Sequence, residues 1–280
     1  MTPSQLEGVI YRAWDFGNPR ASMEGFAART QTEESESSCH IWRTQMARAL
    51  GLQGDFEGAR EILAKVRAAI DQLPHGPDRH HLAARLAIES GRVLNSEGDP
   101  ASARPYFDLA NQEATAAAAE GLAIDALHMI AIVEGKLGGS SESRVWNEAA
   151  LAQARDSKDP DARRWQASLL NNLGWDLHDA GDPERALSRF EEAAELRRQS
   201  GTPVAIEHAE WAVVRALRSL GRFDEALAVQ LGLASQPPGA DDRYVYQEIG
   251  ENLRALGRVE QAEPVLARAR ELLGPEPTAG

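Results

Sequence analysis

The chain has 280 residues, 30 basic and 43 acidic side chains, and a formal charge of −13. This length exceeds one ordinary compact core, which indicates two domains or one elongated array, and the acidic charge argues against binding nucleic acid or an anionic membrane. Cys39 is the single cysteine, which excludes an intrachain disulfide, and no apolar run of about 18 residues predicts a membrane span. Residues 1–14 lack a basic patch followed by an apolar run, so we expect no secretory signal and a cytoplasmic protein. The excess of arginine over lysine suggests a bacterial genome rich in GC.

Two short helices are predicted at the N-terminal end. Residues Ser4 to Glu7 have the pattern of a capping box, which predicts a helix over about 4–15. Asn18-Pro19 indicates a turn, and Ser22 is a candidate cap for a second helix over about 22–31. We expect this hairpin to cover the open end of an array that follows it.

From residue 54 onward, a glycine followed five residues later by a small residue recurs six times. Four residues before the glycine stands a leucine in five of the six cases, and seven before it a mostly small residue. This register predicts six helix pairs, each joined by a glycine turn. The pairs of positions are Gly54/Ala59, Gly98/Ala103, Gly138/Ser143, Gly181/Ala186, Gly221/Ala226 and Gly257/Ala262.

The fourth unit shows how each pair is specified. Residues 169–177 place leucines and Gly174 on one face at helical spacing. Gly181 then ends the helix, because a left-handed backbone favours glycine. Asp182-Pro183 begins the next helix as N-cap and first residue. The small Gly174 and Ala186 allow the two helix backbones to approach closely.

These residues resemble the tetratricopeptide repeat family over about residues 40–272, best at 167–193 and 243–269. The resemblance implies an all-α fold, a right-handed superhelical α-solenoid of stacked antiparallel helix pairs. Most repeats are 40–44 residues apart rather than the usual 34, which predicts longer helices. Asn147 and Gln230 replace the usual large apolar residue, so the third and fifth repeats are degenerate. The expected segments are a hairpin cap with an acidic linker over 1–38, one continuous solenoid of six repeats over 39–273, and a disordered tail over 274–280.

No motif for catalysis, metal or cofactor stands out. His80 and His81 would diverge by roughly 100° on a helix, so exposed or loop histidines are favoured over a metal site. Gly135 to Ser141 has its lysine before the later glycines, unlike a phosphate-binding loop, and is predicted to be a turn. We therefore expect no enzyme, no catalytic residue, no metal and no cofactor.

A binding signal comes from polar and aromatic stripes on the first helix of each pair. In the fourth repeat Asn171, Trp175 and His178 lie at i, i+4 and i+7, and the fifth repeat carries a similar stripe. The resemblance implies that groove asparagines and basic residues hold the backbone or carboxylates of extended peptides. The predicted groove residues are Arg48, Arg92, His128, Asn171, Asn172, Trp175, His178, His208, Trp211, Arg215 and Arg218.

The chemistry of these side chains agrees with that implication. Asparagine satisfies both a donor and an acceptor of a peptide backbone, arginine forms a planar fork for carboxylates, and tryptophan supplies rigid contact area. The alternative is that Trp175 and Trp211 pack between adjacent helices, while acids such as Glu89, Asp179 or Glu248 neutralise the arginines. The remaining tryptophans, at positions 14, 42, 146 and 165, fit packing better.

The sequence thus favours a non-enzymatic module that binds a peptide segment or a partner protein, with acidic or C-terminal carboxylate features, in a concave groove. A ligand- or peptide-sensing regulator that acts through a protein partner is the first alternative, and an enzyme or accessory subunit the second. A homodimer through an open solenoid end is a further option, because residues 264–273 read as an amphipathic last helix. No nucleic acid or membrane partner is expected.

Overall fold

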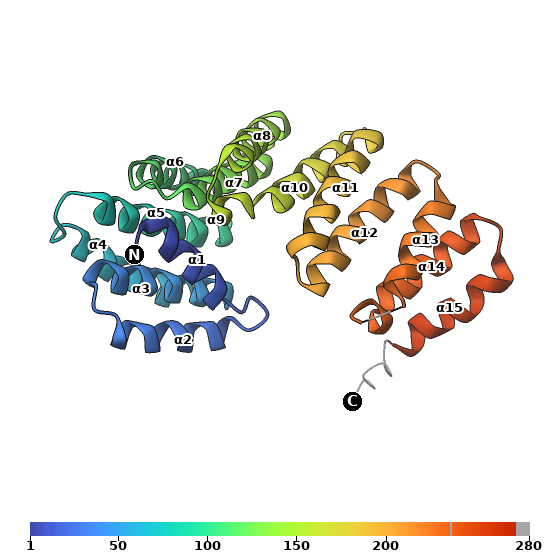
Figure 1. Ribbon diagram of the computed structural model, residues 1–280, viewed down its shortest axis with the longest axis horizontal. Coiled ribbons are helices and arrows are strands. Elements are labelled where there is room, and N and C mark those ends of the chain that lie inside the picture. Colours follow the sequence, from blue (N-terminus) through green and yellow to red (C-terminus); the bar gives the residue numbers. More distant parts are fainter. Residues whose placement is uncertain (236, 273–280) are drawn as a thin grey trace. The chain divides into compact units, whose positions relative to one another are not determined.

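The computed structural model describes residues 1–235 and 237–272. Within these residues the secondary structure is helical, without a strand, and the chain divides into two compact units, Met1–Trp165 and Gln166–Gly280 (Figure 1). In both units the helices follow one another as antiparallel pairs, which confirms the predicted all-α fold of stacked helix pairs. None of the described helices is long and apolar enough to cross a bilayer.

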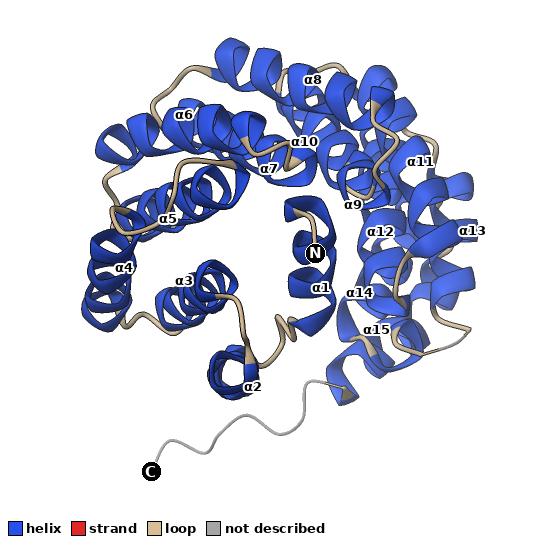
Figure 2. Cartoon of the chain, turned by 60° about the vertical axis from the view of Figure 1, so that its left-hand side comes forward, coloured by secondary structure: helices blue, strands red, loops and turns tan. Residues whose placement is uncertain are grey.

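The first unit stacks three helix pairs and adds two helices before them and a short one after them. Figure 2 shows α3, α5 and α7 as an inner row, with α4, α6 and α8 outside them and α1 within the curve. α2 packs on α3, whereas α1 contacts α5, α7 and α9 on the inner side. The helices are α1 (Pro3–Ala13), α2 (Pro19–Thr32), α3 (Glu36–Leu52), α4 (Phe56–Ile70), α5 (Pro77–Ser96), α6 (Pro100–Ala116), α7 (Glu120–Lys136), α8 (Ser140–Asp156) and α9 (Pro160–Arg163).

The N-terminal caps differ from the predicted ones. Thr2 Oγ1 accepts a hydrogen bond from the Gln5 backbone, and Gln5 Oε1 accepts one from the Thr2 backbone at 2.9 Å. The capping box therefore begins at Thr2 and not within Ser4 to Glu7. Asn18, not Ser22, caps α2. In both helices a proline occupies the first helical position, where its missing N–H costs no hydrogen bond, and this places the cap one residue before it.

The second unit consists of three further pairs, with a short 3-10 turn, η1 (Gly239–Asp241), before the last pair. Its helices are α10 (Gln166–Asp179), α11 (Pro183–Ser200), α12 (Pro203–Ser219), α13 (Phe223–Leu233), α14 (Arg243–Ala255) and α15 (Val259–Glu271). The division into a 1–38 cap and one continuous 39–273 solenoid stays a prediction, and the expected tail over 274–280 lies outside the described residues.

The six predicted turn glycines join the helices of the pairs. Their φ angles lie between +71° and +92°, the left-handed region in which a Cβ is strained. After three of these turns an aspartate caps the next helix, as at Asp99 and Asp182, whose carboxylates accept the backbone N–H three residues on. In these three pairs the turn chemistry thus fixes where the second helix begins.

Small residues bring the paired helices together, as predicted. A Cβ added to Gly91 would lie 2.6 Å from the Phe107 ring, and one added to Gly174 would overlap the Phe190 ring. Phe107, Phe190 and Ala186 are fully buried. Each phenyl ring therefore fills the space that the facing glycine leaves open.

Candidate functional site

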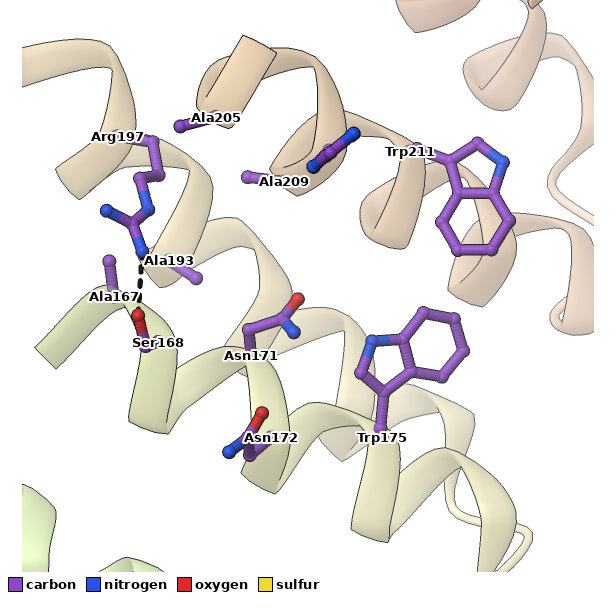
Figure 3. Close-up of a pocket in the computed structure, with 11 residues that line it drawn as sticks. Ala167, Ser168, Asn171, Asn172, Trp175, Ala193, Arg197, Ala205, Ala209 and Trp211 are labelled. Atoms are coloured by element: carbon purple, nitrogen blue, oxygen red, sulfur yellow. Dashed lines mark hydrogen bonds between the residues drawn. The ribbon is translucent and has the colours of Figure 1, made fainter. Parts of the chain in front are cut away.

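A groove of about 480 Å³ lies in the second unit between α10 and α12, with α11 as its floor. Five predicted groove residues, from both first helices, line it, and Figure 3 shows the labelled ones arranged around the hollow. The lining residues are Ala167, Ser168, Asn171, Asn172, Trp175, Ala193, Arg197, Ala205, His208, Ala209 and Trp211.

Helical spacing explains why these side chains meet. Asn171 and Trp175 lie one turn apart on α10, opposite the fully buried Leu170, while His208 and Trp211 lie three residues apart on α12. Because α10 and α12 are the first helices of neighbouring pairs, their non-core stripes face the same hollow.

The two indoles form an aromatic wall. The ring centroids of Trp175 and Trp211 are 5.7 Å apart with a 41° angle between the planes. Trp175 also packs on Phe190 at 5.0 Å, so it supports the core as well as lining the groove. Trp211 is 38% exposed. The wall therefore offers accessible apolar surface that is held in place from behind.

Polar groups of the groove have unused hydrogen-bonding capacity. The side-chain amide of Asn171 hydrogen-bonds to no described residue. Arg197 Nη2 donates to Ser168 Oγ at 2.8 Å, and no carboxylate of the described residues pairs with its guanidinium (Figure 3). None of the lining residues is acidic. An amide and an uncompensated cation thus face the same hollow as the indoles.

Three other predicted residues of this unit lie beside the groove. His178 stacks edge-on against Trp175 and bonds to Ser219 Oγ at 2.9 Å. Arg218 Nη2 donates to Glu251 at 2.9 Å, a second Arg218 nitrogen pairs with Glu248, and Arg215 lies 3.6 Å from Glu248. Burial lowers the pKa of Arg218, but its bonds to the two glutamates outweigh burial and leave the pKa raised. The positive charges of these arginines are therefore compensated by α14.

Arg197 was missed in the sequence because only first helices were expected to line the groove. It lies on α11, a second helix, four residues after the fully buried Ala193 and seven after Phe190. The sequence does contain a signal for Arg197: a long, positively charged side chain stands at the helical spacing that continues the apolar inner stripe.

The remaining predicted residues, Arg48, Arg92 and His128, lie in the first unit around the buried Asp125. Arg92 donates to Asp125 at 2.6 and 2.8 Å and to Glu89 at 2.7 Å. Burial lowers the pKa of Arg92, but these two carboxylates outweigh it and raise the pKa. Burial also lowers the pKa of His128, which packs against Trp165. Arg48 hydrogen-bonds to no described residue and lies over the ring of Trp14.

One histidine expected to be exposed is buried. His81 is 2% exposed, and its Nε2 lies 2.6 Å from Glu7 Oε1, which also accepts from Arg85 Nε at 2.8 Å. Burial lowers the pKa of His81 to about 4, so the neutral ring donates to the carboxylate. The expectation failed because Glu7 comes from α1, 74 residues away in the chain. No group of three or more potential metal-binding side chains occurs among the described residues.

Stacked helix pairs joined by left-handed glycine turns, with small residues at their crossings, define a helical repeat protein. Residues 122–199 match the family model described as tetratricopeptide repeat. The tetratricopeptide repeat resemblance seen in the sequence is therefore confirmed for residues 122–199.

Solved structures share this fold at low sequence identity. The apo form of RapI matches with a TM-score of 0.70 and 12% identity, over 96% of this chain and 76% of that one. A signal-transduction ATPase with a tetratricopeptide repeat sensor, from Pyrococcus horikoshii, matches with a TM-score of 0.70 and 11% identity, over 96% of this chain and 41% of that one. BtubC from P. vanneervenii matches with a TM-score of 0.52 and 15% identity, over 100% and 96%. No match was found among curated protein sequences.

Proposed function

We propose that the chain is a non-catalytic protein-interaction module, and that the groove between α10 and α12 binds a peptide segment of a partner protein through a carboxylate. The observation that carries the proposal is the combination, in one groove without acidic residues, of the Asn171 amide, the Trp175/Trp211 wall and the Arg197 guanidinium. An asparagine amide can pair with both groups of a peptide unit, and a guanidinium suits a side-chain or C-terminal carboxylate.

Arg197, rather than Arg215 or Arg218, is the carboxylate anchor of this proposal. Arg215 and Arg218 already face glutamates of α14, so a ligand carboxylate would have to compete with Glu248. Arg197 gives up only the hydroxyl of Ser168, a neutral acceptor. A ligand carboxylate would add an opposite charge and a second acceptor oxygen that matches the guanidinium fork, neither of which the hydroxyl supplies.

The test starts from random decapeptides with free C-termini, selected on the full chain. The selected peptide is then measured by fluorescence anisotropy against Arg197→Met and Asn171→Ala. We expect Kd to rise about tenfold or more for Arg197→Met, equivalent to about 1.4 kcal/mol. The anchoring carboxylate of the peptide can be neutralised by C-terminal amidation or by Glu→Gln. This change should raise the Kd of the wild-type chain by the same factor and leave the Kd of the Arg197→Met chain unchanged.

Arg185→Met is the matched control, because Arg185 lies on the same helix and forms an exposed pair with Asp182 outside the groove. Its Kd should equal that of the wild type. Failure to enrich any peptide, or equal Kd values for Arg197→Met and Arg185→Met, would refute the proposal that this groove binds a peptide through Arg197.

A second candidate is a regulator that senses a ligand or peptide and acts through a protein partner. It is favoured by one observation, the fold shared with a repeat segment described as a sensor in the Pyrococcus horikoshii protein. Cytoplasmic location and a homodimer through an open end of the array also remain proposals. Light scattering of the full chain tests the dimer, which requires a mass of twice 30.5 kDa.

A further inference from the structure

The concave side of the first unit is occupied in part by a helix of the chain itself. Leu6 and Ile10 of α1 are 5% and 2% exposed and belong to one core cluster with Leu82 and Leu86 of α5. Glu7 lies beside them on the helix and is 3% exposed. α1 lies within the curve of the first unit (Figure 2). One face of α1 thus buries a carboxylate together with two aliphatic side chains against the inner row of helices.

This carboxylate is the hydrogen-bond acceptor for two buried side chains of α5. Glu7 accepts from His81 Nε2 at 2.6 Å, from Arg85 Nε at 2.8 Å, and from a second nitrogen of Arg85. The third nitrogen, Arg85 Nη1, lies 3.5 Å from Glu89 and hydrogen-bonds to no described residue. Without Glu7, the buried Arg85 guanidinium would keep the charges of Glu89 and Asp125 but would lose its hydrogen-bonded carboxylate, and removing one partner of a buried ion pair is strongly destabilising.

The helix pairs around this site also contribute more positive than negative side chains. Asp125 interacts electrostatically with all four arginines of this region. Burial, followed by repulsion from Arg92, lowers the pKa of Arg48 to about 10. The cluster comprises Arg48, Arg85, Arg92 and Arg164 against Glu89, Asp125 and Asp161, so that a fourth carboxylate from outside the helix pairs balances it.

Aromatic side chains of α1 and of the residues just after it make further contacts with the concave surface. The Arg164 guanidinium lies 3.7 Å from the ring centroid of Tyr11. Trp14 Nε1 donates to Gln45 Oε1 at 3.0 Å, and Arg48 lies 5.3 Å from the ring centroids of both Trp14 and Phe16. Polar and charged side chains of α3, α5 and the segment at Arg164 therefore contact α1 and the residues just after it, in addition to the packing of α1 on α7.

Removing α1 would separate no helix pair. A loop over residues 14–18 joins α1 to α2, and residues 15–18 are exposed. α2 packs on α3 through contacts of its own, and its Phe26, fully buried, lies against Trp42 as well as against Trp14. The groove walls therefore persist when α1 leaves, while Arg85 and His81 lose their partner.

We propose that the concave surface of the first unit is a receptor site for an amphipathic helix that carries a carboxylate between aliphatic side chains. In this structure α1 is its resident occupant, and a partner helix of the same chemistry replaces it. This site is separate from the groove between α10 and α12, and its test does not depend on that groove.

The experiment uses a fluorescent peptide of residues 1–17 and the full chain. Gly8 is buried and faces Asp161, and a Cβ at Gly8 would overlap the Asp161 carboxylate. The much larger leucine side chain of Gly8→Leu is therefore expected to expel α1, while every other residue of the site is unchanged. The peptide should bind Gly8→Leu about tenfold or more tightly than it binds the wild type. Equal binding to both chains, or no binding to either, overturns the proposal.

Two controls define the recognition. Arg12→Leu adds the same side chain to the exposed face of α1 and should leave peptide binding at the wild-type level. A peptide with Glu7→Gln should bind Gly8→Leu about tenfold or more weakly, because it presents no charge to Arg85. A peptide that binds equally well with Gln contradicts the carboxylate requirement.

A measurement on the wild type covers the case in which Gly8→Leu does not fold. Excess unlabelled peptide should speed amide hydrogen exchange in α1 and leave exchange in α2 unchanged. If exchange in α1 does not respond to a saturating peptide concentration, α1 is not displaceable and the proposal fails.

Discussion

At the scale of single residues, the second unit contains a carboxyl group with an altered acidity. Glu207 of α12 is 7% exposed and hydrogen-bonds to Asp242, the N-cap of α14. Burial and then the bond and like charge of Asp242 raise the pKa of Glu207 from its ordinary 4.5 to about 7. At pH 6 the folded chain therefore holds a proton here that the unfolded chain has released.

This difference predicts that stability decreases as pH rises from 4.5 to 7, because the folded state binds more protons than the unfolded state in that window. Glu207→Gln cannot ionise and should remove the dependence. We expect the free energy of unfolding of the wild type to fall by about 1–3 kcal/mol more than that of Glu207→Gln between pH 4.5 and pH 8. Urea unfolding at the two pH values measures it. Glu195→Gln, at an exposed position of α11, should keep the wild-type slope, and identical slopes for all three chains would contradict the assignment.

At the scale of helix pairs, the residue at the helix crossing and the residue sixteen positions later are matched in size. Glycine at 91, 174 and 250 faces Phe107, Phe190 and Leu266. In the other three repeats the same register pairs a larger first residue with a different partner: Ala47 with Leu63, Ala131 with Asn147, and Val214 with Gln230. The two repeats that read as degenerate therefore combine a larger first residue with a polar second one. Gln230 is buried and accepts from Asn252 Nδ2 at 2.5 Å.

Gly174→Ala should consequently lower the free energy of unfolding by about 1–3 kcal/mol, although alanine is the better helix former. The added methyl group overlaps the Phe190 ring. Adding Phe190→Leu to the Gly174→Ala chain reproduces at 174 and 190 the alanine–leucine pair found at Ala47 and Leu63. It should recover part of the lost free energy of unfolding, which a double-mutant cycle measures. Gly232→Ala, where a Cβ meets no atom within 4 Å, should be neutral or stabilising. Additive effects at 174 and 190 would exclude the proposed match.

The helix pairs could be predicted from the sequence because their determinants are local. The glycine turn at Gly181, the Asp182 cap and the inner stripe through Phe190 lie within one repeat, and each appears in the structure as expected. The position of α1 could not be predicted, since the contact between Glu7 and Arg85 joins residues 78 positions apart. The contribution of Arg197 likewise depends on how successive helices pack. The pairing of the arginines with Glu89 and Glu248, by contrast, is the alternative to ligand binding that the sequence predicts. The site residues themselves stay a prediction.

At the scale of the whole chain, most packing joins helices that are neighbours in the stack. α15 packs mainly on α14, at the end of the described array, whereas α5 packs on α3, α4 and α6. In such arrays stability is a sum of repeat and nearest-neighbour contributions. The same substitution should therefore destabilise fewer helices at the end of the array than in its interior.

Gly257 and Gly98 provide the comparison, because both are turn glycines, with φ of +73° and +90°. An alanine at either position costs about 1 kcal/mol or more of backbone strain. We expect Gly257→Ala to lower amide protection in α14 and α15 and to leave α10 and α11 protected, because the end pair can open while its neighbours stay folded. Gly98→Ala should lower protection together in α3 to α8, since α5 and α6 have packed neighbours on both sides. Hydrogen exchange read by mass spectrometry distinguishes the two patterns. Equal loss of protection in α10 and α15 after Gly257→Ala would show that the second unit opens as one cooperative body and not pair by pair.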